Sequence, residues 1–155
     1  MDFSEIITGL LWIGSAPSRE DLAELKRQIG TGLVVLDLNR NAEEENWCRE
    51  LGVTYDERVP QIGDSAPIPV SKLRLIARII DQHVSAGRKV FLHCTAGRGR
   101  SPTCAAAYLI HGGMSLSEAR RFVSEKRVVW IGDDSSYASA LEEFAKVQEI
   151  AHFSG

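Results

Sequence analysis

Short, unbroken apolar runs alternate with amphipathic helical patterns along most of this chain. The runs at residues 33–36 and 90–92 are typical of strands that are covered on both faces. Between them, the apolar residues of 71–86 recur at helical spacing along one stripe. Alternating strands and helices are typical of an α/β fold, in which helices pack on both faces of a sheet. We therefore predict a central, largely parallel sheet of about four to five strands flanked by helices.

The same patterns place the other elements. Strands are expected over residues 10–13 and 53–57, and helices over 18–30, 43–51, 101–112, from 115 onward and over 135–151. Residues 59–69 form a long loop that contains Gly63, Asp64 and several prolines, so we expect it to be functional rather than merely connecting. The site should lie at the C-terminal end of a central strand.

Composition and charge favour some classes of protein over others. With 155 residues, of which 44% are hydrophobic, the chain has the size of one domain, and we treat residues 1–155 as a single domain. Its net charge of −3, with mixed signs, lacks the basic footprint of a nucleic-acid-binding protein. The acidic N-terminal residues and the lack of a long apolar run predict neither a signal peptide nor a membrane segment, so we expect a cytoplasmic protein.

The cysteines point to a reduced protein. Cys48, Cys94 and Cys104 are odd in number and unevenly spaced, which argues against a disulfide framework, and no Cys/His cluster has zinc-ligand spacing. We expect Cys48 and Cys104 to be core residues. We also expect no metal, no cofactor and a monomer.

The segment from His93 to Ser101, HCTAGRGRS, carries the chemistry. A thiol attacks phosphorus only as its thiolate, and at a helix N-terminus beside cations its pKa falls to roughly 3.5–7.5. The connection between strand and helix is short enough to curl with its N–H groups inward, and its glycines permit unusual conformations. It consists of Thr95, Ala96, Gly97, Arg98 and Gly99. This segment therefore predicts an anion-binding nest around Cys94.

Two residues complete this nest. Arg100 can return its guanidinium to the same anion and hold two phosphate oxygens. Ser101 is expected to cap the following helix, with Pro102 at the first helical position, and to place a hydroxyl near the sulfur. A plain turn with a small apolar cysteine would not need strand, cysteine, glycines, arginine and serine to coincide.

These residues carry a family resemblance. His93-Cys94, five residues and Arg100-Ser101 resemble the signature of protein tyrosine phosphatases, and the Ala-Gly-Arg-Gly-Arg interior is similar to their dual-specificity branch. Residues 7–15 are similar to the opening of small dual-specificity phosphatases, and residues 33–101 follow their order of elements. The resemblance implies phosphoryl transfer without a metal. The chain departs from many members at Arg127-Val128, where they carry Arg-Pro, and at Tyr137, near their glutamine.

A leaving group on phosphorus needs a proton donor, and a carboxylic acid on a loop can supply it. Asp64 has this loop context and resembles the family's acid in position. Asp56, in an expected strand, is the alternative, and Glu57 is a further candidate. His93 is expected to support the loop by hydrogen bonding rather than to react.

Two more charged features, Arg98 and the acidic run at residues 43–45, are not assigned to the reaction. Arg98 could meet a second substrate phosphate or point into solvent. The run Glu43-Glu44-Glu45 lies in the first turn of an expected helix, where the macrodipole favours acidic side chains on a solvated face.

We expect a cysteine-dependent phosphatase that acts on phosphotyrosine in proteins, with phosphoserine and phosphothreonine as further substrates. The alternatives are a phosphoinositide, phospholipid or RNA 5′-phosphate phosphatase. A non-catalytic phosphate-binding module or a sulfurtransferase could use the same thiolate nest. The expected partners are phosphorylated proteins.

Overall fold

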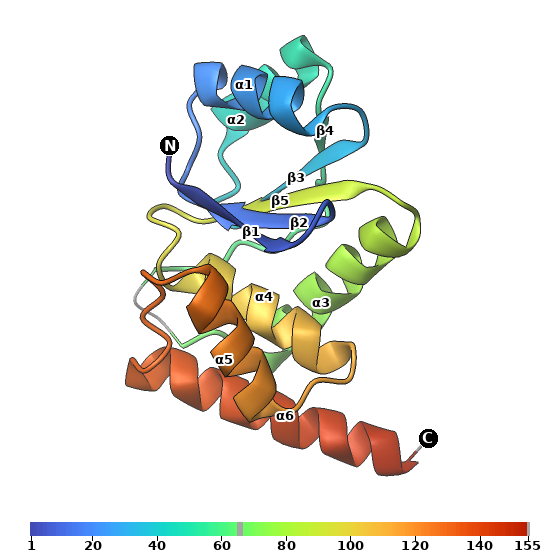
Figure 1. Ribbon diagram of the computed structural model, residues 1–155, viewed down its shortest axis with the longest axis vertical. Helices are drawn as coiled ribbons and strands as arrows, with labels where there is room; N and C mark the ends of the chain where they lie inside the picture. Colours follow the sequence, from blue (N-terminus) through green and yellow to red (C-terminus); the bar gives the residue numbers. More distant parts are fainter. Residues whose placement is uncertain (65–66, 155) are drawn as a thin grey trace.

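The centre of the protein is a five-stranded sheet with strand order β1-β2-β5-β3-β4 (Figure 1). The computed structural model describes residues 1–64 and 67–154, with side chains to residue 150. Its strands are β1 (Phe3–Ile7), β2 (Leu11–Gly14), β3 (Leu33–Asp37), β4 (Thr54–Tyr55) and β5 (Lys89–His93). Only β1 pairs in antiparallel fashion, with β2, and the other pairs are parallel. The predicted α/β fold with a largely parallel sheet is confirmed.

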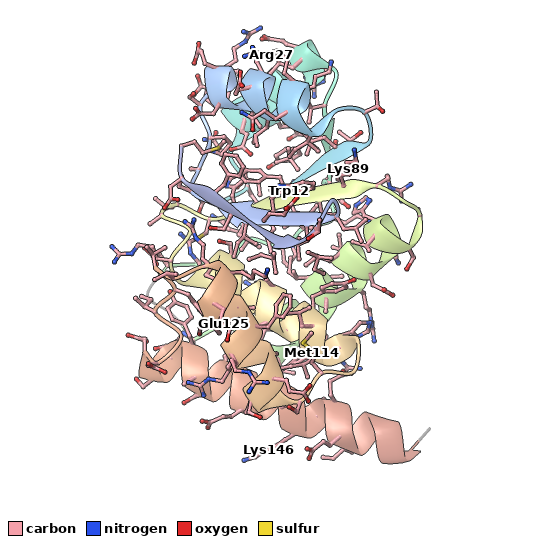
Figure 2. The ribbon with its side chains drawn as sticks, viewed as in Figure 1. Trp12, Arg27, Lys89, Met114, Glu125 and Lys146 are labelled. Atoms are coloured by element: carbon pink, nitrogen blue, oxygen red, sulfur yellow. The ribbon has the colours of Figure 1, made fainter. Side chains whose placement is uncertain are left out.

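Helices cover both faces of this sheet. One face carries α1 (Arg19–Ile29) and α2 (Ala42–Leu51), and the other side carries α3 (Val70–Ser85), α4 (Arg100–His111), α5 (Leu116–Lys126) and α6 (Ser135–Ser154) (Figure 1). The last of these lies outermost, packed on α3, α4 and α5. Arg27 on α1 and Lys146 on α6 point outward from the two helical layers (Figure 2). Within residues 1–64 and 67–154, no helix has both the length and the apolar character needed to cross a membrane.

The position of β5 at the centre of the sheet explains the unbroken apolar run at residues 90–92. Phe91 packs with Trp12 and Leu22 in the core beneath α1 and α2. Val90 and Leu92 belong to the second core, beneath α3 and α4. Alternate residues of a strand face opposite sides, so a strand between two helical layers needs an apolar residue at every position. The parallel neighbours β2 and β3 end at the same edge as β5, where Cys94 follows.

Sequence patterns did not predict β1. Of its residues Phe3–Ile7 only Ile6 is buried, and the pairing with β2 is irregular between Glu5 and Ile7. Such a strand has no clear alternation of apolar and polar residues. β4 is also shorter than the expected strand over 53–57, and Asp56 follows it. Ser65 and Ala66, within the expected loop over 59–69, lie outside the described residues.

Gly14 sets how closely β1 approaches β2. A Cβ on Gly14 would lie 2.5 Å from the Asp2 carbonyl oxygen and 2.7 Å from the Phe3 Cβ. Gly14→Ala should force β1 outward and lower the free energy of unfolding by about 1–3 kcal/mol, as overpacking does. Urea unfolding measures this loss. Gly112→Ala is the control, because its Cβ would meet nothing closer than 3.5 Å. Equal stability of the two variants would contradict this account of the β1–β2 contact.

Candidate active site

Cys94 directly follows β5 and lies at a cleft of about 360 Å³. Its side chain is buried, with 3% exposed. The cleft is lined by Asp64, Cys94, Thr95, Ala96, Arg98, Gly99, Arg100, Ile131 and Tyr137. The structure thus brings together most of the residues that the sequence predicts for the site. Gly97, Ser101 and His93 are buried and are not among the residues that line the cleft.

The loop between β5 and α4 is anchored by its carbonyl groups. Hydrogen bonds from outside the loop turn these carbonyls outward: Ala16 N to Thr95 O (2.9 Å), Arg127 Nε to Gly97 O (2.9 Å) and Ile131 N to Arg98 O (2.8 Å). In a trans peptide the N–H of the next residue points opposite to the carbonyl. The N–H groups of Ala96, Arg98 and Gly99 therefore turn toward the inside of the loop, as an anion nest requires.

The two loop glycines serve different purposes. Gly97 has φ +69°, in the left-handed region, and a Cβ there would overlap Gly14 and Arg127. Gly99 has φ −127°, which other residues adopt, so its backbone conformation does not require glycine. A Cβ on Gly99 would instead overlap the phenol of Tyr137. Gly99 is therefore needed for the close approach of α6, which the sequence alone did not predict.

The surroundings of Cys94 favour its thiolate. Burial by itself would raise the pKa of this thiol, but the Ser101 hydroxyl, the N–H groups of Ser101 and Gly97 and the charge of Arg100 lower it below the ordinary value. The Ser101 oxygen lies 3.4 Å from the sulfur. The expected cap role of Ser101 is wrong: α4 begins at Arg100 with Gly99 as N-cap, and no side chain caps it. The hydroxyl is directed to the sulfur instead of to the helix end.

Arg100 is buried and held in one orientation. Its Nη1 donates to Asn39 Oδ1 and to the Ile62 carbonyl oxygen, both at 2.8 Å. Its Nη2 donates to Thr95 Oγ1 at 3.1 Å. The Arg100 Nε has no hydrogen-bond partner. Among the buried side-chain nitrogen and oxygen atoms in the described part of the chain, it alone lacks one. An unpaired buried donor is costly, and an anion in the cleft would relieve that cost. Asn39 was not predicted as a site residue.

Asp64 lies at the cleft, as its predicted role requires. Its Oδ1 is 3.9 Å from Arg100 Nε, and its side chain is 71% exposed. A carboxyl group at the mouth of the cleft can reach the leaving-group oxygen of a phosphate that sits on the loop. The position supports Asp64 as the proton donor.

Asp56 is placed outside this lining, in a structural cluster. It lies 2.6 Å from His83 Nε2 and accepts two hydrogen bonds from the Arg58 guanidinium, at 3.0 and 2.7 Å. Burial by itself would raise the pKa of Asp56, but the hydrogen bonds from Arg58 and His83 hold it well below the ordinary range. A carboxylate that stays ionised is a poor proton donor at neutral pH, so the geometry favours Asp64 over Asp56.

Of the two residues Glu44 and His93 behind the loop, Glu44 differs from expectation and His93 agrees with it. Glu44 was expected on a solvated face, but it is 1% exposed and its Oε2 lies 2.5 Å from His93 Nε2. His93 Nδ1 lies 3.0 Å from the Cys94 carbonyl oxygen, which is the kind of loop contact expected of His93. The pattern of a helix N-terminus predicts acidic residues at its first turn but not which of them turns inward.

Arg127 is the buried anchor of the loop. Besides Gly97 O, its guanidinium contacts Asp2 at 2.9 and 3.0 Å and Ser4 at 3.0 Å. It therefore ties the N-terminal strand to the phosphate loop. In the sequence Arg127 stood out only as part of a departure from the family pattern. Two of its partners, Asp2 and Ser4, lie more than a hundred residues away.

Comparison with known proteins agrees with this geometry. The model of the family "Dual specificity phosphatase, catalytic domain" matches residues 11–147, and the chain belongs to this family. The dual specificity protein phosphatase Mpk3 of Drosophila melanogaster is 30% identical over 79% of this chain and 29% of its own length. Phosphatidylglycerophosphate phosphatase PTPMT2 of Arabidopsis thaliana is 28% identical over 89% of this chain and 60% of its own length.

A solved structure shows the same architecture. The crystal structure of Tk-PTP in the active form has a TM-score of 0.76 and 28% identity, and the match covers 93% of this chain and 96% of that chain. The chain spans less than two thirds of the length of the curated relatives named above. The chain is thus similar both to a relative named as a protein phosphatase and to one named as a phospholipid phosphatase.

The Asp56 cluster should stabilise the fold rather than the reaction. Asp56→Asn removes a buried charge from its partners and should cost about 2 kcal/mol of unfolding free energy at pH 7. Because the folded pKa of Asp56 is depressed, its contribution is present above its unfolded pKa of about 4 and is lost as pH falls through the folded value. Urea unfolding from pH 7 to pH 3 should show the gap to the parent protein shrinking.

Asp133→Asn is the matched control for this change, since the Asp133 side chain is fully exposed in a surface ion pair. It should change the stability little at either pH. If Asp56→Asn behaved like this control, the cluster would have no such role.

Proposed function

We propose that this chain is a cysteine-dependent phosphatase that works through a phosphocysteine at Cys94. One observation carries the proposal: a thiol with a lowered pKa lies in the same cleft as the inward N–H groups of the loop and the Arg100 Nε, which has no hydrogen-bond partner. Thiolate, backbone donors and guanidinium converge where a phosphate group would sit. Residues 1–155 would act as one catalytic domain.

The reaction has two steps. The Cys94 thiolate attacks phosphorus, the bond from phosphorus to the leaving oxygen breaks, and Asp64 donates its proton to that oxygen. Water then attacks the phosphocysteine, Asp64 takes up a proton from it, and the S–P bond breaks to return the thiolate and release inorganic phosphate. The loop N–H groups and Arg100 stabilise the charge on the phosphate oxygens in both steps, and Ser101 stabilises the departing thiolate.

We take phosphotyrosine in proteins as the favoured substrate, with phosphoserine and phosphothreonine as further ones. Ile131 and Tyr137 supply apolar and aromatic walls to the cleft, against which a phenyl ring can pack. The Drosophila relative is named as a dual specificity protein phosphatase. Arg98 is exposed at the rim, where it can meet an acidic group beside the phosphorylated residue.

The role of Asp64 can be tested by the leaving group. Asp64→Asn should lower kcat/KM about 10²-fold or more for aryl phosphates with poor leaving groups and less for activated ones, because only the former need the proton. Initial rates across a series of aryl phosphates measure this, with Asp133→Asn as the control for an exposed carboxylate. A uniform loss across the series, or a harmless Asp64→Asn beside a folded but inactive Asp56→Asn, would refute the assignment.

A second candidate function is the hydrolysis of a phospholipid headgroup. The segment beside the cleft exposes Val128, Val129 and Ile131, with 84%, 39% and 46% of each residue exposed. Ile131 and Arg98 both line the cleft, and the Ile131 N–H donates to the Arg98 carbonyl oxygen, so an apolar side chain and a cation flank the same cleft. Such an arrangement suits an amphipathic substrate, and the Arabidopsis relative is named as a phosphatidylglycerophosphate phosphatase.

A substrate panel separates the candidates. Tyrosine phosphopeptides, phosphatidylglycerophosphate and phosphoinositides in vesicles, and a 5′-phosphorylated RNA are compared by phosphate release in the presence of a chelator. The favoured reading predicts the highest kcat/KM on the phosphopeptide and little effect of Val128→Asp. Fast turnover of vesicle lipid, lost about tenfold or more in Val128→Asp as apolar contact is removed, would establish the lipid candidate instead. Phosphopeptide binding without any turnover would point to an inert module.

A further inference from the structure

A cluster of ionisable side chains lies buried directly behind the phosphate loop. It joins Asp37 at the end of β3, Glu44 on α2 and His93 at the end of β5, each with at most 1% exposed. His93 also stacks on Phe91, with ring centroids 5.4 Å apart. None of these three carboxyl and imidazole groups reaches the cleft, so the reaction as proposed above does not use them.

The hydrogen-bond partners of His93 determine where its protons lie. Nδ1 faces the Cys94 carbonyl oxygen at 3.0 Å, and a carbonyl can only accept. Nε2 faces Glu44 Oε2 at 2.5 Å, and an ionised carboxylate can only accept as well. Burial raises the pKa of Glu44, whereas the hydrogen bond and the charge of His93 lower it. With Glu44 ionised, both ring nitrogens carry hydrogen, which makes the ring an imidazolium cation.

The rest of the cluster favours this charged pair. Asp37 Oδ1 lies 3.7 Å from His93 Nε2 and adds a second negative charge. Asp37 itself accepts hydrogen bonds from Tyr55 Oη (3.0 Å) and from the N–H groups of Asn39 (2.8 Å) and Asn41 (2.7 Å), as an ionised carboxylate would. Burial by itself would lower the pKa of His93, but the Glu44 and Asp37 carboxylates and the Cys94 carbonyl raise it.

A metal ion is a poorer occupant of this cluster, although its ligand atoms lie within 4.8 Å of one another. A bound zinc ion would need about 2.0–2.2 Å to each nitrogen or oxygen. The Nε2–Oε2 distance of 2.5 Å is that of a hydrogen bond and leaves no room for an ion between these atoms.

We propose that Glu44 is a positioning residue that keeps His93 doubly protonated, with the positive end of the pair directed at Cys94. His93 is hydrogen-bonded to the Cys94 backbone, whereas Glu44 lies on the far side of the ring. The cation is therefore the nearer charge, and it favours the thiolate over the neutral thiol. The inference rests on the proposed role of Cys94 as nucleophile and adds a buried group that prepares it.

The consequence for a variant follows from the charges. In Glu44→Gln the ring can keep its Nδ1–H bond to the Cys94 carbonyl while losing its second proton. The thiolate then loses its neighbouring cation, and the pKa of Cys94 should rise by about half a unit to one unit. If His93 instead stayed charged without Glu44, removal of the carboxylate would lower the pKa of Cys94.

The test is the rate of Cys94 alkylation by iodoacetamide between pH 4 and 9, followed by peptide mass spectrometry. Below the thiol pKa, Glu44→Gln should react about threefold to tenfold more slowly than the parent protein. Glu43→Gln is the matched control, because it removes an exposed carboxylate from the neighbouring position of the same helix and should leave the profile unchanged. An unchanged or lower Cys94 pKa in Glu44→Gln would overturn the proposal.

A second measurement needs no variant. Nitrogen-15 chemical shifts of the His93 ring in the intact protein should report both nitrogens protonated at pH 7, and a singly protonated ring would also overturn the proposal. Neither measurement depends on turnover. A shifted Cys94 pKa without hydrolysis of aryl phosphate would leave this inference standing and refute the proposed function, and hydrolysis with an unshifted pKa would do the reverse.

Discussion

The outward anchoring of the loop carbonyls is the interaction on which the rest of the site depends. Thr95, Gly97 and Arg98 each give their carbonyl oxygen to a donor outside the loop, and one of these donors is the buried guanidinium of Arg127. Once the carbonyls face outward, planar trans peptides turn the N–H groups inward. A ring of inward donors attracts negative charge, whether it is carried by the Cys94 thiolate or by a phosphate group.

The surrounding fold makes this arrangement rigid. β5 delivers Cys94 from between two hydrophobic cores, and the small buried residues of α4 let that helix pack closely on the sheet. Arg100 is held by hydrogen bonds at Nη1 and Nη2, while Nε makes no hydrogen bond. The protein thus stores an unsatisfied donor and a stabilised thiolate in one cleft, and burial elsewhere offsets the cost of both.

Local patterns predicted the central features well and the distant contacts poorly. The strand, loop and helix around Cys94 follow from a continuous apolar run, glycines and Arg100, all within a few residues. The burial of Glu44 could not be predicted, because nothing within α2 distinguishes it from its acidic neighbours. Its partner His93 belongs to β5, which is distant in the sequence. Arg127 depends in the same way on Asp2 at the other end of the sequence. The cap expected of Ser101 was wrong because α4 begins at Arg100, so Ser101 lies within the helix and its hydroxyl is 3.4 Å from the Cys94 sulfur.

The most direct test of the account is to look for the covalent intermediate itself. The protein is mixed with an aryl phosphate, quenched in acid within one turnover and digested, and the peptides are sequenced by mass spectrometry. The account predicts a phosphoryl group on the sulfur of Cys94 that forms and decays at the rate of turnover. Turnover without phosphorylated Cys94, or undiminished turnover in Cys94→Ser, would contradict it.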